Sequence, residues 1–151
     1  MPFFLADGAR IHYEEQGSGA PLLLIHGLGS SGRDWALQRP FVQARHRVIT
    51  CDLRGHGRSD CPPGPYSIPQ FARDVALLLR HCEASPAHVV GLSMGGMVAL
   101  ELAVHNRRAL RSLTRQPHQL DVAELKTSSA SRSRANCAAV RSPSSPSVTG
   151  S

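Results

Sequence analysis

A serine flanked by glycines is the residue of this sequence best placed to do chemistry. Ser93 stands in the run Gly91-Leu-Ser93-Met-Gly95, after the apolar run 87–90 and before the mostly apolar run 96–104. A sharp strand-to-helix turn exposes such a serine at the end of the strand, where the first amides of the helix favour an anion. A nucleophile beside an anion site is what acyl transfer requires. We predict that Ser93 is a nucleophile; the alternative is a chance GxSxG run in a glycine-containing loop.

A second glycine-rich loop, 26–30, follows the apolar run 21–25. In an open α/β sheet, ligands bind at the carboxyl ends of the strands. The backbone amide of Leu28, paired with that of Met94, is therefore predicted to form an oxyanion hole. His26 opens this loop, and we interpret it as a structural hydrogen-bonding group. Its alternative role is that of the catalytic base.

The third loop, 52–60, reads DLRGHGRSD and follows the apolar run 47–51. A carboxylate at Asp52 and a guanidinium at Arg54, followed by alternating glycines, predict a loop held by an internal ion pair and by backbone hydrogen bonds. Its predicted role is to support the rim of the active site. A phosphate-binding loop is excluded because no Gly-Lys-Ser/Thr run follows.

The elements that must position these loops can be predicted from hydrophobic periodicity. Residues 10–15 alternate like a half-buried antiparallel strand. The runs 21–25, 47–51 and 87–90 are continuous and apolar, which is typical of strands buried on both faces of a parallel sheet. Apolar residues at helical spacing over 71–82, with Ser67 and Pro69 at the start, predict a helix. The order indicates an α/β fold with a mostly parallel sheet and helices on both faces.

Taken together, the three loops resemble the α/β-hydrolase fold family from about residue 3 to residue 114. Within it, the chain looks like small bacterial esterases, enol-lactone hydrolases and cofactor-free haloperoxidase-like members. The resemblance implies hydrolysis of a carboxylic ester or lactone, with Ser93 as nucleophile and the amides of Leu28 and Met94 as oxyanion hole. Serine rather than aspartate at 93 argues against the epoxide hydrolase and haloalkane dehalogenase branches. The motif positions implied to be structural are His26, Gly27, Asp52, Arg54, Gly91 and Gly95.

The rest of the catalytic apparatus is not identified in the sequence. In this family the chain order is serine, then acid, then histidine. Among the acids after Ser93, only Glu101 precedes a histidine, and it lies in the helix that follows the serine, about 12 Å along its axis. We therefore predict a chain truncated before its catalytic acid and histidine. The alternative is a non-catalytic, truncated or decayed chain that acts as an interaction fragment.

Composition divides the 151 residues into two parts. Residues 1–114 are predicted to form a partial hydrolase domain. Residues 115–151 are rich in Ser, Arg and Pro, hold no aromatic residue, and are predicted to be disordered, with 115–126 as a candidate helical turn. Loss of the later strands would place the strand before Ser93 near an open edge, a site for self-association or aggregation.

Several classes of partner and location are excluded by composition. No apolar run exceeds five residues, so no transmembrane helix and no membrane partner are predicted. The first residues do not read as a secretory signal, which predicts a cytoplasmic protein with reduced thiols. No spacing of Cys or His suggests a metal or another cofactor. The net charge is +6, yet no basic stripe interleaved with aromatics is present, so nucleic acid is not predicted as a partner. Binding through the Arg/Ser tail remains the alternative.

Overall fold

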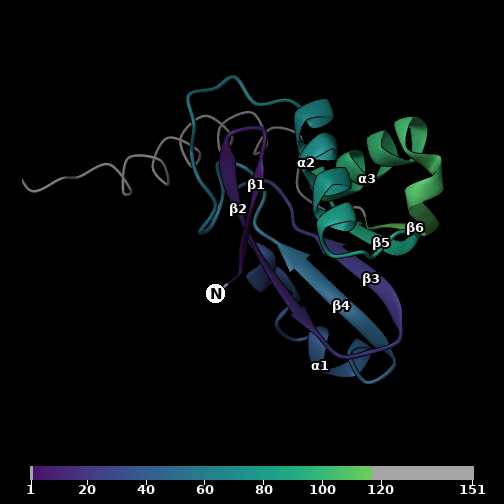
Figure 1. Cartoon of the computed structure of the whole chain (residues 1–151). Helices are drawn as coiled ribbons and strands as arrows, with labels where there is room; N and C mark the ends of the chain where they lie inside the picture. Colours follow the sequence, from purple (N-terminus) through teal and green to yellow (C-terminus); the bar gives the residue numbers. More distant parts are fainter. Residues whose placement is uncertain (1, 117–151) are drawn as a thin grey trace, which may run out of the picture.

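The computed structural model of the chain describes residues 2–116, which form one mixed six-stranded sheet with helices packed against it (Figure 1). The strands lie in the order β1-β2-β4-β3-β5-β6. The first two are antiparallel to their neighbours, and the other four run parallel to one another. The strands are β1 Phe3–Ala6, β2 Ala9–Gln16, β3 Ala20–Ile25, β4 His46–Cys51, β5 Ala87–Leu92 and β6 Leu110–Gln116. The helices are η1 Gly32–Trp35, α1 Arg39–Val42, α2 Ile68–His81, α3 Met94–His105 and η2 Arg107–Ala109.

The centre of the sheet is built from the continuous apolar runs. Leu23 of β3 pairs with Ile49 of β4 on one side and with Val89 of β5 on the other. All three side chains are buried in the larger of two apolar clusters, which lies under α2 and α3. Leu22 and Leu24 point to the opposite face, into a smaller cluster. The prediction of parallel strands buried on both faces is confirmed for β3 and β4.

Helix α2 begins and packs as its sequence predicts. The Ser67 hydroxyl caps its first turn by accepting from the Gln70 amide at 3.3 Å, and proline occupies the first turn. The large apolar residues of one face are buried at 0–4% exposure; they are Phe71, Val75, Leu78 and Leu79. Helix α3 follows β5 without a connecting loop and packs against α2, β5 and β6. On the other face, η1 packs against β3 and β4, and α1 packs against β4.

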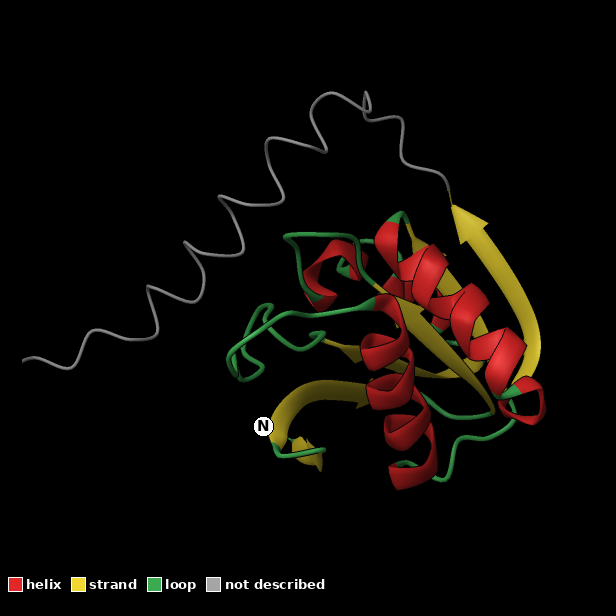
Figure 2. Cartoon of the chain, turned by 90° about the horizontal axis from the view of Figure 1, so that it is seen from above, coloured by secondary structure: helices red, strands yellow, loops and turns green. Residues whose placement is uncertain are grey.

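The C-terminal side of the sheet contains the strand before Ser93 and one strand beyond it. The strand before Ser93, β5, lies between β3 and β6, and β6 is the edge strand within residues 2–116 (Figure 2). Arg115 and Gln116 belong to β6, so the predicted boundary at residue 114 cuts this strand two residues short. Beyond Gln116, the predicted disorder and helical turn lie outside the described residues. Among the helices of residues 2–116, none combines the length and the apolar character needed to cross a bilayer.

Candidate active site

Ser93 occupies a strained turn between β5 and α3. Its backbone has φ 50° and ψ −113°, a conformation that residues other than glycine rarely adopt. Its amide donates to the carbonyl of Gln116 at 3.1 Å, which ties the turn to the end of β6. The side chain is half-buried. The turn therefore presents the Ser93 hydroxyl at the carboxyl end of β5, next to the N-terminus of α3.

Two glycines allow this turn to close. A Cβ atom on Gly91 would lie 2.3 Å from the carbonyl oxygen of Gly95. A Cβ atom on Gly95 would in turn lie 2.4 Å from the carbonyl oxygen of Ile25, at the end of β3. Side chains at these positions would push α3 away from the sheet. The GxSxG spacing is thus explained by close backbone contact on both sides of the serine.

The loop after β3 lies against the same turn. A Cβ atom on Gly27 would be 3.7 Å from the Cβ atom of Ser93, so the 26–30 loop and the turn at Ser93 are within van der Waals distance of each other. Leu28 follows Gly27 and packs against the larger apolar cluster. Met94 is the first residue of α3, where backbone amides have no partner within the helix and the helix dipole favours an anion. The segments that carry both predicted oxyanion donors therefore meet at Ser93.

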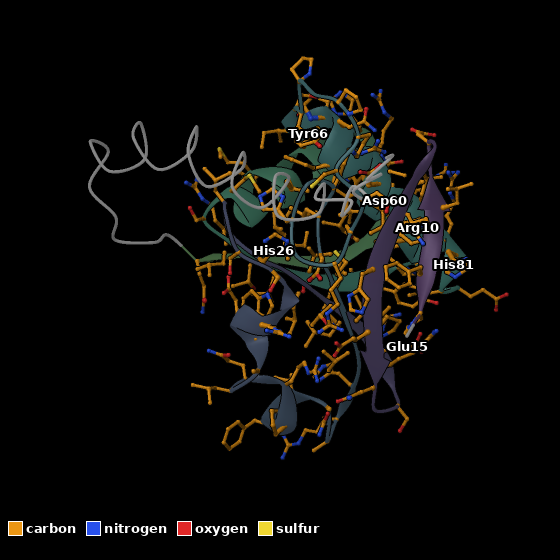
Figure 3. The ribbon with its side chains drawn as sticks, turned by 90° about the vertical axis from the view of Figure 1, so that its left-hand side faces the viewer. Arg10, Glu15, His26, Asp60, Tyr66 and His81 are labelled. Atoms are coloured by element: carbon orange, nitrogen blue, oxygen red, sulfur yellow. The ribbon has the colours of Figure 1, made fainter. Side chains whose placement is uncertain are left out.

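His26 is fully buried, and both of its ring nitrogens are engaged. Nδ1 donates to the carbonyl of Gly27 at 2.7 Å, and Nε2 accepts from the amide of Leu53 at 2.9 Å. These bonds join the end of β3 to the loop after β4. Figure 3 shows His26 deep inside the molecule, away from the exposed pair Arg10 and Asp60. No bond of this ring reaches Ser93 among the described residues.

The burial of His26 makes stability depend on pH. Burial lowers the pKa of His26 from 6.5 to about 4. Between about pH 4 and pH 6.5, His26 therefore binds a proton in the unfolded chain but not in the folded chain. Stability is then fully present above pH 6.5 and is lost as the pH falls towards 4, by up to about 3 kcal/mol. We expect His26→Asn, which leaves the Leu53 amide unpaired, to be less stable at pH 7 but less sensitive to acid. Urea unfolding of both proteins between pH 7 and 4.5 measures this, and equal pH slopes would contradict it.

The 52–60 loop is held differently from the prediction. The Asp52 carboxylate accepts from the amides of Gly32 at 2.7 Å and Arg58 at 2.9 Å, and it lies 3.3 Å from Nδ1 of the buried His12. It forms no ion pair with Arg54. The predicted internal ion pair is therefore wrong: Asp52 closes the loop through backbone amides, and Arg54 turns towards another element.

The partner of Arg54 is Asp74, on the buried face of α2. Nε of Arg54 donates to one carboxylate oxygen at 2.9 Å and a terminal nitrogen donates to the other at 2.8 Å. The same guanidinium donates to the carbonyl of Ala6 at 3.0 Å. Hydrogen bonding to Asp74 raises the pKa of Arg54 above its ordinary value. This buried pair locks the loop after β4 onto α2 and the end of β1.

Sequence reasoning missed Asp74, although a signal for it existed. Asp74 lies one residue before Val75 and three after Phe71, both on the apolar face of the predicted helix. A carboxylate on such a face needs a buried cation. The structural role of Ser59 was not predicted either. Its hydroxyl accepts from the His12 amide at 2.8 Å and donates to the Asp52 carbonyl, which links the 52–60 loop to β2.

No general base for Ser93 is found in residues 2–116. The one acid–histidine pair after the serine in that range is Glu101 and His105, 3.2 Å apart and one turn from each other near the end of α3. His105 is 64% exposed, and neither group bonds to Ser93. Residues 2–116 contain no group of three His, Cys, Asp or Glu side chains able to hold a metal ion.

The fold and the turn at Ser93 define the class of protein. The family model for the α/β hydrolase fold matches residues 20–116, and the chain belongs to this family. It is 40% identical over 114 residues to a protein of Azorhizobium caulinodans named as a candidate carbamate hydrolase, RutD, covering 76% of this chain and 43% of that protein. It is also 40% identical over 84 residues to 3-oxoadipate enol-lactonase 2 of Acinetobacter baylyi, covering 56% of this chain and 32% of that protein.

The three-dimensional structure of the chain is also similar to a solved structure. The enol-lactonase from Burkholderia xenovorans LB400 superposes with a TM-score of 0.72 at 32% identity, over 74% of this chain and 45% of that one. The chain thus spans less than half the length of each of these relatives.

Proposed function

We propose that this chain carries the nucleophile half of a serine hydrolase that acts on a small carboxylic ester or lactone. The Ser93 oxygen would bond to the carbonyl carbon, and the amides of Leu28 and Met94 would hold the oxyanion that forms. The C–O bond to the alcohol then breaks, the alcohol takes up the serine proton, and an acyl-enzyme remains. The observation that carries this proposal is the strained backbone of Ser93 between two closely packed segments. The enol-lactonases among the relatives favour an ester or lactone substrate.

We also propose that the 151 residues do not hold a complete proton relay. Serine is a weak nucleophile until a histidine accepts its proton and an acid orients that histidine. After Ser93, Asp121 and Glu124 have no histidine behind them, and Glu101 pairs with His105 away from the serine. This observation favours the second candidate function, a non-catalytic chain that acts as an interaction fragment.

Labelling with a fluorophosphonate tests which candidate holds. We expect the probe to modify Ser93 slowly, and we expect Ser93→Ala to abolish both the labelling and any hydrolysis of p-nitrophenyl acetate. The rate of any residual hydrolysis should be at most on the order of 10³ times the rate in water, the enhancement that remains when triad groups are missing. Ser18→Ala, in the exposed segment between β2 and β3, is the matched control and should change neither signal.

Peptide mapping of the labelled protein decides the outcome. Modification confined to Ser93 supports the hydrolase proposal, and rapid turnover by the purified chain would contradict the incomplete relay. A chain that shows a cooperative thermal transition but leaves Ser93 unmodified contradicts the hydrolase proposal and supports the interaction fragment.

A further inference from the structure

A small cavity opens between strands β2 and β4 and the segment that contains η1 and α1. Its volume is about 220 Å³, below the roughly 300–1,000 Å³ of a site for a drug-sized ligand, so it suits a small ion or molecule. Neither Ser93 nor any residue of the 26–30 loop lines it. Strands β3 and β5 separate β4 from β6, so the cavity lies towards the β1 side of the sheet. Its charged and titratable lining residues are His12, Glu14, Arg33, Arg39, Asp52 and Arg58.

The lining of this cavity carries a net positive charge. It contains three arginines and two carboxylates, which leaves one charge in excess. Burial lowers the pKa of His12 below its ordinary value, so the ring adds no charge at neutral pH. The charge therefore favours an anion over a cation.

The Asp52 carboxylate is already engaged by the wall of the cavity. It accepts from the amides of Gly32 and Arg58, and its Oδ2 lies 3.3 Å from Nδ1 of His12. Nε2 of the same ring accepts from Nη1 of Arg58 at 3.1 Å, which places the ring proton on Nδ1, facing Asp52. Asp52 thus holds the backbone and His12 in place around the cavity.

Glu14 is the lining carboxylate that meets the arginine side chains. Nη1 of Arg39 donates to its Oε2, and Nη2 of Arg58 lies 3.4 Å from its Oε1. Hydrogen bonding from Arg39 lowers the pKa of Glu14, so this carboxylate stays ionised at neutral pH. Arg33, at the exposed mouth, forms no ion pair with any residue that the structure describes. One carboxylate therefore serves a cluster of three guanidinium groups, each with five donors.

We propose that this cavity binds a small oxyanion, held by Arg33, Arg39 and Arg58. Guanidinium groups pair with phosphate and carboxylate oxygens through two parallel hydrogen bonds. A phosphate group is favoured over a carboxylate because it carries more charge at neutral pH. The site lies outside the candidate active site and does not depend on the function proposed for Ser93.

Glu14 competes with the oxyanion for the same donors. Its side chain and that of Arg39 are 29% and 23% exposed, so their interaction is screened less by water than that of a surface pair. Loss of the Glu14 charge should therefore strengthen binding of the oxyanion. If Glu14 only held the arginines in place, its loss would weaken binding instead, so the two roles predict opposite signs.

Calorimetric titration of the full chain with inorganic phosphate at pH 7.5 and constant ionic strength tests the proposal. We expect phosphate to bind more tightly than acetate. Glu14→Gln should tighten phosphate binding about tenfold, and Arg39→Gln should weaken it about tenfold. Arg33→Gln, which breaks no ion pair, should weaken it about threefold. Arg45→Gln removes the same charge from an exposed arginine outside the lining and should leave binding unchanged.

The other outcomes overturn the proposal. Absence of phosphate binding both in the unmodified chain and in Glu14→Gln would exclude an oxyanion site in this cavity. Weaker binding by Glu14→Gln would show that this residue supports the arginines rather than competing for them. An equal loss in Arg33→Gln and Arg45→Gln would assign the binding to overall charge. Ser93→Ala should bind phosphate as the unmodified chain does, so the result is independent of whether Ser93 is reactive.

Discussion

Replacing Gly95 with alanine is expected to move the start of α3 and to slow the labelling of Ser93 on the order of a hundredfold. The new Cβ atom would lie 2.4 Å from the carbonyl oxygen of Ile25 and 2.6 Å from that of His26. Both oxygens belong to the backbone, so no side-chain rotation relieves the overlap. The helix must shift by about 1 Å to restore ordinary contact. The cost in unfolding free energy is about 3 kcal/mol, measurable by urea unfolding.

Gly27→Ala is the matched control because it adds the same methyl group beside the same turn. Its Cβ atom would lie 3.5 Å from the carbonyl oxygen of Leu92, an ordinary contact. Its backbone does not require a positive φ. We expect its stability to be unchanged or higher by about 0.5 kcal/mol. If Gly95→Ala is as stable as Gly27→Ala, the close contact between α3 and β3 does not hold the turn in place.

The elements around Ser93 could be predicted because their signals are local. Continuous apolar runs mark β3 and β4, and the spacing of apolar residues with Ser67 marks α2. The GxSxG run places two glycines where the backbone comes closest. Each of these signals lies within a few residues of what it predicts.

The first hairpin also carries a local signal in the sequence. Asp7 and Gly8 join β1 to β2 with φ 43° and 80°, the left-handed conformation that tight hairpin turns need. An Asp-Gly pair between apolar residues at 3–6 and the alternating run that follows predicts such a turn. Strand β1 could therefore have been predicted from sequence.

The bonds that hold the loops together could not be predicted, because they join segments far apart in the chain. The ring of His26 bonds the amide of Leu53, 27 residues later. Arg54 bonds Asp74 rather than the nearer Asp52. Residue spacing shows that a buried charge needs a partner, but only packing decides which partner it meets.

Removal of the Asp74 carboxylate is expected to destabilise the chain by about 3–5 kcal/mol, because it leaves the Arg54 guanidinium buried without a counter-charge. The two side chains are 2% and 8% exposed, so salt should screen the pair little. We expect Asp74→Leu and Arg54→Met to be severely destabilised when tested singly. The double variant should be more stable than either single variant, since no buried charge then remains. Urea unfolding of all four proteins gives the coupling energy directly.

The exposed pair Arg10–Asp60 provides the comparison for this cycle. It joins β2 to the end of the 52–60 loop at 3.1 Å, but its side chains are 67% and 35% exposed. Exposed ion pairs contribute little and are weakened by salt. Asp60→Asn should therefore cost much less than Asp74→Leu, and its effect should shrink in 1 M salt while that of Asp74→Leu persists. If the double variant is no more stable than the singles, the penalty comes from lost packing under α2 rather than from an unpaired charge.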